Sequence, residues 1–216
     1  MNDEPEEADE DLMLAYAAGD ASAFTRLYDR HERAVHRFFR RQAVAANEAD
    51  DLLQNTWMAV VRNAGGYAPD AKFTTWLYTI ARSKLVDHWR ATRRHMALAP
   101  DAANDPDDVE EHGASILLER IAADESARPD MQAMSRQYAN AFIAAVEALP
   151  APQREAFLLH VEGDVSIEAM AAITSVGIET AKSRLRYAMK RLRFACAEWL
   201  QPRASNIQAT GDETRS

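Results

Sequence analysis

Lysine and arginine are concentrated in two segments of this chain, a grouping that suits the binding of nucleic-acid phosphates. Residues 178–193 hold six basic side chains and one acid, and residues 62–96 hold seven basic side chains and two acids. The net charge is nevertheless −9, because residues 1–11 carry seven acids and no base, and residues 97–135 carry ten acids and two bases. The sequence therefore contains two basic patches and two acidic segments, and the basic patches are suited to binding phosphates despite the negative net charge.

The basic segment 178–193 has the pattern of a recognition helix. Residues 166–174, a turn at 175–177 and a helix from Ile178 fit a helix-turn-helix, whose second helix enters the major groove. Helical spacing places one apolar side on that helix, made of Ile178, Ala181, Leu185, Ala188 and Leu192. Lys182, Ser183, Arg186 and Tyr187 fall on the opposite side within the first two turns, where polar side chains reach base edges. Better placed for phosphates are Arg184, Lys190, Arg191 and Arg193. An ordinary basic surface helix is the alternative.

The basic segment 62–96 alternates aromatic and basic side chains along FTTWLYTIARSKLVDHWRATRR, residues 73–94. We expect the preceding loop to expose Tyr67, Lys72 and Phe73. Such a combination holds single-stranded DNA, because bases stack on aromatic rings with about 1 to 3 kcal/mol each while cations follow the backbone. Trp76 and Trp89 also suit a helical core, so that alternative stays open.

A third segment, DDLLQNTWMAVV, carries more apolar and amide side chains than one core face can absorb. Leu53, Gln54, Asn55 and Met58 fall on several faces of the expected helix. Apolar side chains beside acidic and amide groups suit a protein partner, and a solvated helix face is the competing interpretation.

Catalytic and metal-binding patterns are missing from the sequence. The six histidines form no HExxH motif, and there is no CxxC, GxSxG or glycine-rich phosphate loop. The single cysteine, Cys196, excludes an internal disulfide, fits a reducing compartment such as the cytoplasm, and reads as a small packing residue. We therefore expect no enzyme activity, no cofactor and no metal.

Composition and periodicity predict an all-α fold. Glycine and proline are scarce, at 7 and 8 residues, and apolar residues recur at three- and four-residue steps from Phe24 and again from Met134. We expect two small helical domains, 12–96 and 134–200, the second holding the helix-turn-helix. Between them, 97–133 is expected to be a flexible acidic linker; 1–11 should be a disordered acidic terminus and 201–216 a polar tail. No apolar run is long enough to enter a membrane.

Taken in order, these segments resemble the extracytoplasmic-function (ECF) group of the sigma-70 family, RNA polymerase sigma factors with regions 2 and 4 joined by a linker. GDASAFTRLYDRH, EADDLLQNTWMAVV and FTTWLYTIARSKLVDHWR resemble region 2, while LPAPQREAFLLHVEGDVSIEAMAAI and ETAKSRLRYAMKRLR resemble region 4. The resemblance covers about residues 12–96 and 136–198. It implies transcription initiation by binding core RNA polymerase and promoter DNA, without catalysis.

The resemblance also implies roles for individual residues. The polymerase-binding helix, which grips the clamp helices of the largest subunit, matches Asp50, Asp51, Leu52, Gln54, Asn55 and Trp57. The −10 element matches Tyr67, Lys72, Phe73, Arg82, Ser83, Arg90, Arg93 and Arg94, and the −35 element matches Lys182, Ser183, Arg184, Arg186, Tyr187 and Lys190. Further implied partners are the flap of the second-largest polymerase subunit and an anti-sigma protein.

Four positions depart from the family pattern: Asn55 and Ser83 replace glutamate and asparagine, and Ser175 and Glu179 replace glycines. Because Ser175 stands in the turn, we expect Gly177 to carry the positive φ. Two other functions fit parts of the sequence, a sigma-like decoy that sequesters an anti-sigma protein and a helix-turn-helix repressor. The acidic stretches 1–11 and 101–111 are also candidates for shielding the basic faces.

Overall fold

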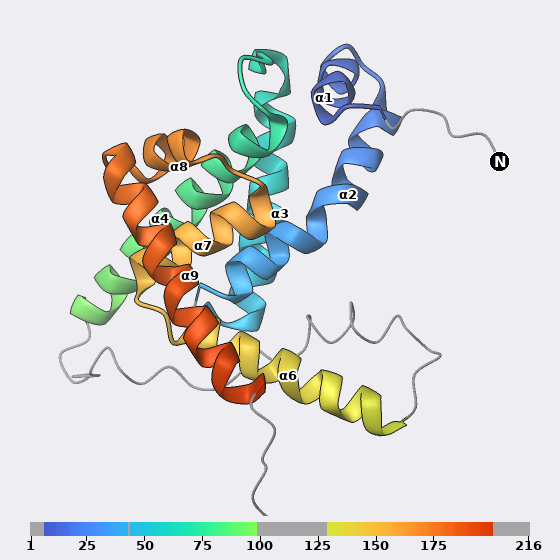
Figure 1. Ribbon diagram of the computed structural model, residues 1–216. Coiled ribbons are helices and arrows are strands. Elements are labelled where there is room, and N and C mark those ends of the chain that lie inside the picture. The colour runs from blue at the N-terminus through green and yellow to red at the C-terminus, as the bar shows by residue number, and fades with distance from the viewer. Residues whose placement is uncertain (1–6, 43, 99–128, 201–216) are drawn as a thin grey trace, which may run out of the picture.

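The computed structural model describes residues 7–42, 44–98 and 129–200, and side chains within 7–42, 44–92 and 138–197. These residues form α1 (Asp9–Ala17), α2 (Ala21–Arg40), α3 (Ala46–Asn63), the 3-10 turn η1 (Ala64–Gly66), α4 (Phe73–Leu98), α6 (Pro129–Glu147), α7 (Ala151–Gly163), α8 (Ile167–Thr174) and α9 (Ile178–Leu200). No strand occurs within these ranges (Figure 1). The all-α prediction is confirmed.

The N-terminal half, α1 to α4, is built around the apolar stripe of α2. Leu27, Val35, Phe38 and Phe39 are fully buried there, and α2 packs against α1, α3 and α4. Asp20 caps the helix, since its side chain accepts a hydrogen bond from the Ser22 N–H at 2.9 Å. The periodicity of the sequence therefore predicted this helix and its buried face correctly.

Helix α1 corrects the expected disordered terminus, because residues 9–11 are helical. Leu12 and Met13 are fully buried, and the Asp9 carboxylate accepts from Arg30 at 2.9 Å and contacts His31 Nε2 at 2.6 Å. Burial opposes ionisation of Asp9, but the hydrogen bonds from His31 and Arg30 hold its pKa below the ordinary value. Glu7 and Asp9 thus pair with Arg26 and Arg30 of α2, and residues 1–6 of the stretch expected to shield the basic faces lie outside the described residues.

The C-terminal half, α6 to α9, contains the expected helix-turn-helix in α8 and α9. The Ser166 hydroxyl accepts from the Ala169 N–H at 3.2 Å and caps α8. In the turn, Ser175 itself adopts the left-handed conformation, with a φ of 55°, whereas Gly177 has no positive φ. The expectation for Gly177 was wrong because the chain reverses at the residue that directly ends α8.

Replacing Ser175 by glycine is expected to stabilise the full-length chain by about 1 kcal/mol, since a side chain in this conformation costs about 1 to 2 kcal/mol and glycine gives back part of that in chain entropy. Thermal unfolding followed by circular dichroism measures the change. Ser175→Ala is the matched control, because it keeps the Cβ and should bring no such gain. An equal effect of both substitutions would contradict the strain at this turn.

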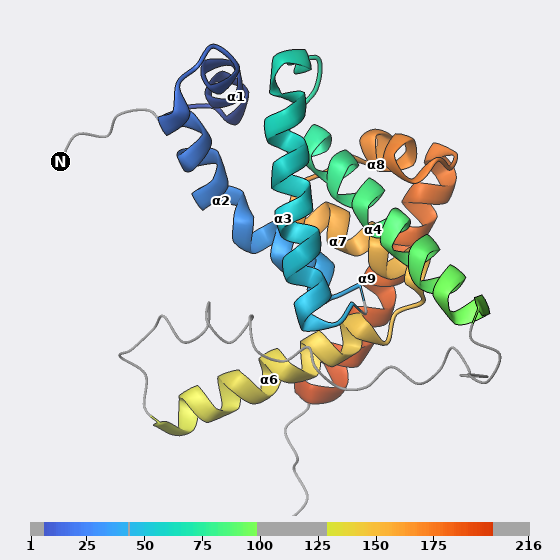
Figure 2. The same ribbon diagram turned by 180° about the vertical axis from the view of Figure 1, so that it is seen from behind.

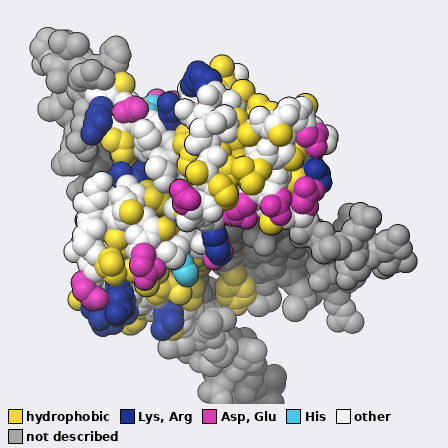
Figure 3. All heavy atoms as spheres, turned by 90° about the horizontal axis from the view of Figure 1, so that it is seen from above, with side chains coloured by type: hydrophobic (Ala, Val, Ile, Leu, Met, Phe, Trp, Pro, Cys, Tyr) yellow, Lys and Arg dark blue, Asp and Glu magenta, His cyan; other side chains and the backbone are white. Residues whose placement is uncertain are grey.

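The two halves pack directly against each other. Helix α7 lies at the centre of the molecule, where it contacts α2 and α4 as well as α9, and α8 contacts α4 (Figure 1, Figure 2). The buried apolar side chains of both halves form one continuous cluster. Seen from above, basic side chains lie mostly around the rim of the molecule, and hydrophobic ones are spread across the face (Figure 3).

The expected domain boundaries are shifted by a few residues. Helix α4 runs to Leu98, and α6 begins at Pro129, within the segment assigned to the linker. The remaining acidic linker, including 101–111, lies outside the described residues, as do residues 1–6 and the tail 201–216. Within the described ranges, no helix has both the length and the apolar character to span a membrane, and no group of three His, Cys, Asp or Glu side chains could hold a metal ion.

Candidate nucleic-acid interface and partner groove

The outer face of α9 is basic and exposed along its first three turns. Lys182, Arg186, Tyr187 and Lys190 are exposed, whereas Ser183 and Arg184 are half-buried. The apolar side of the helix is buried as expected at Ala181, Leu185, Ala188 and Leu192. Ile178 is the correction, because it is 51% exposed; it occupies the first position of α9, ahead of the turns that pack on α7 and α8.

Two contacts tune this face. The Arg186 guanidinium carbon lies 5.2 Å from the centre of the Tyr187 ring, a cation–π arrangement that orients both side chains. Lys182 Nζ lies 3.8 Å from the Glu179 carboxylate, and both side chains are largely exposed, so the pair is weak and leaves Lys182 available. Glu179 therefore reduces the positive charge at the start of α9 only slightly.

Tyr67, in the loop before α4, and Phe73, the first residue of α4, are buried, which corrects the expectation that both are exposed. Tyr67 is 8% exposed and Phe73 is fully buried, and with Trp76 they form a cluster whose ring centres are 5.1 to 6.2 Å apart. Lys72, between them, is exposed. Burial, with the nearby Glu10 and Asp9, raises the pKa of Tyr67 to about 12. Aromatic composition alone could not separate stacking platforms from core, because both need the same side chains.

Glu10 connects α1 to the start of α4. Its carboxylate accepts a hydrogen bond from the backbone N–H of Phe73 at 2.6 Å, across 63 residues of sequence. A carboxylate at a helix N-terminus satisfies an otherwise unpaired N–H group and complements the positive end of the helix dipole. This contact fixes the point where the loop from Tyr67 enters the helix.

Replacing Glu10 by alanine is expected to lower the free energy of unfolding by about 1 kcal/mol, the usual loss for a helix cap. Asp11→Ala is the matched control, because Asp11 lies in the same turn of α1 and is exposed. Thermal unfolding of the two full-length variants gives the comparison. If Asp11→Ala destabilised the chain as much as Glu10→Ala, the loss would come from the dipole of α1 rather than from the contact with Phe73.

The predicted −10 residues on α4 have different surroundings. Ser83 is exposed, and Arg90, also exposed, lies 3.7 Å from Asp87. Arg82 donates from Nε to Glu155 at 2.9 Å, and Lys72 Nζ lies 2.6 Å from Asp164; both acids belong to the C-terminal half. Arg93 and Arg94 lie on α4, but their side chains are outside the described residues. Trp76 and Trp89 are half-buried.

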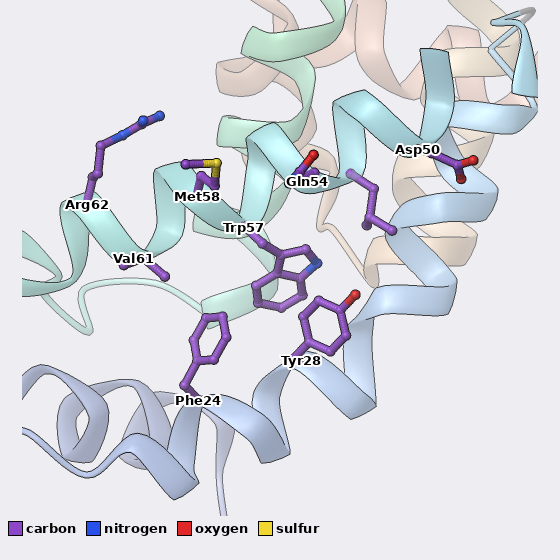
Figure 4. Close-up of a pocket in the computed structure, with 9 residues that line it drawn as sticks. Phe24, Tyr28, Asp50, Gln54, Trp57, Met58, Val61 and Arg62 are labelled. Atoms are coloured by element: carbon purple, nitrogen blue, oxygen red, sulfur yellow. The ribbon is translucent and has the colours of Figure 1, made fainter. Parts of the chain in front are cut away.

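An apolar groove of about 450 Å³ lies between α2 and α3. Its floor is an aromatic cluster in which the Trp57 ring centre is 5.7 Å from that of Phe24 and 5.1 Å from that of Tyr28. The exposed side chains of Met58 and Val61 stand on one wall, and polar groups of Asp50, Gln54 and Arg62 lie around it (Figure 4). Trp57 Nε1 is buried without a hydrogen-bond partner among the described residues.

The groove holds three of the six predicted partner-binding residues. Asp50, Gln54 and Trp57 line it, and Asp51 and Asn55 are exposed beside it on α3. Leu52 is only 5% exposed and belongs to the core, which corrects that prediction. Phe24 and Tyr28 were missed because they share the apolar stripe of α2 with residues that are buried.

Comparison with known proteins agrees with this architecture. The family model for sigma-70 region 2 matches residues 27–95, and that for sigma-70 region 4 matches residues 139–192. The ECF RNA polymerase sigma factor SigM of Mycobacterium tuberculosis is 31% identical over 187 residues, 87% of this chain and 84% of SigM. RNA polymerase sigma factor CnrH of Cupriavidus metallidurans is 27% identical, over 87% of this chain and 94% of its own.

Solved structures share the fold. The structure of CnrH in complex with the cytosolic domain of CnrY aligns with a TM-score of 0.56 at 21% identity, over 89% of this chain and 99% of that one. Sigma factor RpoE in complex with the anti-sigma factor NepR from Bartonella quintana aligns with a TM-score of 0.58 at 22% identity, over 81% and 96%.

A helical fold that contains a helix-turn-helix with a basic exposed face on its second helix is typical of DNA-binding proteins. The family matches make the class specific. This chain belongs to the ECF RNA polymerase sigma factors of the sigma-70 family.

Proposed function

We propose that this chain starts transcription by carrying core RNA polymerase to promoters whose −35 element is read by α9. The observation that carries the proposal is the exposed face of Lys182, Arg186 and Tyr187 in the first turns of a helix-turn-helix. Polar side chains at this end of a recognition helix reach base edges in the major groove, and Lys190, farther along, suits a phosphate. Ser183 and Arg184, which are half-buried, support the edges of this face.

The groove between α2 and α3 is the proposed contact for the clamp helices of the largest polymerase subunit. An apolar floor with an unpaired indole N–H fits a helix that presents apolar side chains and one acceptor. Asp51 and Asn55 then contribute polar contacts at its margin. The flap of the second-largest subunit is the proposed partner of the C-terminal half.

The −10 strand is proposed to lie along α4 and the loop before it. Lys72, Arg82, Ser83, Arg90, Arg93 and Arg94 are the candidate contacts for the strand backbone. The buried positions of Tyr67 and Phe73 mean that base capture requires the loop to open, and unstacking a base itself costs a few kcal/mol.

Regulation by an anti-sigma protein is part of the proposal. The structural neighbours CnrH and RpoE are described in complexes, RpoE with the anti-sigma factor NepR. By analogy, we expect such a partner for this chain. The chain itself is proposed to act in the cytoplasm with RNA polymerase and to have no catalytic activity of its own.

The decisive experiment is transcription in vitro with purified chain, core polymerase and genomic promoter fragments, followed by mapping of the start sites. The expected result is initiation only when the chain is present, from sites that share −35 and −10 sequences. Footprinting with and without core polymerase separates the alternatives, because a repressor protects duplex DNA without polymerase and a decoy protects no DNA under either condition.

A further inference from the structure

An acid stands at the beginning of the basic face of α9. Glu179 is the one acid within residues 178–193, and it lies in the first turn of the helix. Lys182 follows it after three residues and Arg186 after seven, about one and two turns, so the three side chains project from one face. We call this face, together with Tyr187, the reading face of α9. The start of α9 lies beside α8 at the outer edge of the molecule (Figure 1, Figure 2), and this end of a recognition helix approaches base edges.

The fold makes little use of the Glu179 carboxylate. The side chain is 87% exposed, and within the described residues its ion-pair partner is Lys182, whose Nζ lies 3.8 Å from Oε1. Two of the first backbone N–H groups of α9 are already paired, because those of Thr180 and Ala181 donate to the Gly177 carbonyl at 2.9 and 3.0 Å. An ion pair as exposed as this one adds little stability. Neither packing nor the ion pair therefore accounts for an acid at this position.

Glu168 shows what the same residue type does where it serves the fold. It is the second residue of α8, as Glu179 is of α9, and both are exposed. The Glu168 carboxylate accepts hydrogen bonds from its own backbone N–H and from the Ser166 hydroxyl, and these bonds hold its pKa below the ordinary value. At α9 the residue corresponding to Ser166 is Gly177, which has no hydroxyl to donate. The helix dipole favours both acids, but the Glu179 carboxylate remains available to a ligand.

A carboxylate in the major groove accepts hydrogen bonds and cannot donate them. Cytosine presents a donor there, its N4 amino group, whereas guanine and thymine present acceptors, and adenine places the N7 acceptor beside its N6 amino group. A carboxylate therefore fits cytosine and is repelled by guanine and thymine. Guanine, the partner of cytosine, offers O6 and N7 to a lysine. An acceptor and a donor 3.8 Å apart, as Glu179 and Lys182 present them, match the two edges of a C·G pair.

From this match we propose that Glu179 is a specificity-determining residue of the −35 site: its carboxylate accepts from N4 of one cytosine, and Lys182 donates to a guanine of the same or the next base pair. The inference rests on the proposed function, since it assumes that α9 enters the major groove of the −35 element. A carboxylate near phosphates is repelled wherever the cytosine is missing. Glu179 therefore acts largely by excluding the wrong base pairs, at a cost in affinity for every sequence.

The test compares Glu179→Gln and Glu179→Ala with the unmodified full chain, each as holoenzyme with core polymerase, in selection from a promoter library with a randomised −35 element. The unmodified chain should select cytosine at one position, roughly 5- to 150-fold over thymine when two fragments compete. Glu179→Ala should lose the preference at that position. Glu179→Gln should change it to adenine, because an amide accepts from N6 and donates to N7 of the same base. A residue with a merely structural role would not exchange one base for another.

Glu168→Gln is the matched control, because it removes the same charge from the same position of the neighbouring helix. Weakening of its contacts at the start of α8 should lower the midpoint of thermal unfolding, while the selected −35 sequence stays that of the unmodified chain. The two Glu179 variants should unfold like the unmodified chain, since the side chain is exposed. Circular dichroism confirms that each variant is folded before the selection.

The inference is overturned if the folded Glu179 variants select the same −35 sequence as the unmodified chain. A uniform rise in affinity with an unchanged sequence would have the same meaning, because Glu179 would then only repel phosphates. A change at the same position in Glu168→Gln would also overturn it. Failure of the proposed function is a different result: the unmodified holoenzyme would enrich no −35 sequence and would give no promoter-specific transcription, and the role of Glu179 would fall with it.

Discussion

Replacing Met58 and Val61 together by aspartate is expected to weaken binding of the chain to core RNA polymerase by about 100-fold or more. The two side chains are 49% and 44% exposed on the wall of the groove between α2 and α3. Two carboxylates brought into an apolar interface without partners cost several kcal/mol, and about 2.7 kcal/mol already corresponds to 100-fold. Because both positions face solvent in the free chain, folding should be retained.

The effect is measured as the dissociation constant for core polymerase by fluorescence anisotropy. Leu14→Asp is the matched control, since Leu14 is 42% exposed on α1 and does not line the groove. The control should bind polymerase like the unmodified chain. Undiminished binding by the folded Met58→Asp and Val61→Asp double variant would rule out the groove as the contact for the clamp helices.

The groove also illustrates what the sequence could and could not predict. Its helix was recognisable because acidic, amide and apolar side chains crowd one segment, more than a single buried face requires. The residues of α2 that form the floor of the groove could not be predicted, because Phe24 and Tyr28 follow the same 3.6-residue spacing as the buried Leu27. Periodicity places a side chain on a face of its helix; how far the neighbouring helix covers that face depends on tertiary packing.

Helix α1 was missed for a related reason. Acids dominate its composition, and the expectation of disorder followed from that charge. Two buried side chains, Leu12 and Met13, together with specific partners for Asp9 and Glu10, are enough to order it. Charge density predicts disorder only where the acids lack partners, and these partners lie about 20 and about 60 residues away in the sequence.

Contact between the halves could not be predicted from the sequence. Glu162 is separated from Arg37 and Arg41 by 125 and 121 residues, and no periodic signal relates them. The basic face of α9 was predictable, because helical spacing within one segment separates it from the buried side, with the exception of the exposed Ile178. The ion pairs of Lys72 and Arg82, by contrast, depend on carboxylates 92 and 73 residues away in the sequence.

Replacing Arg186 by alanine is expected to change the −35 preference at one base pair by about 1 to 3 kcal/mol, or roughly 5- to 150-fold in relative affinity. Arg186 is exposed on the reading face of α9 and is held over the Tyr187 ring. An arginine so oriented can donate two hydrogen bonds to one guanine edge, and its loss leaves that base unread. Selection of −35 sequences by holoenzyme from a randomised promoter library measures the preference.

Lys190→Ala is the matched control for Arg186→Ala. Lys190 is exposed on the same helix, about one turn farther along, where a cation reaches phosphates rather than base edges. Its loss should weaken binding to all promoters about equally and reduce the dependence of log affinity on log salt by about one. If Arg186→Ala behaved in this way too, with an unchanged consensus, then Arg186 would bind the backbone, and the reading of the −35 element would have to lie with Lys182, Ser183 or Tyr187.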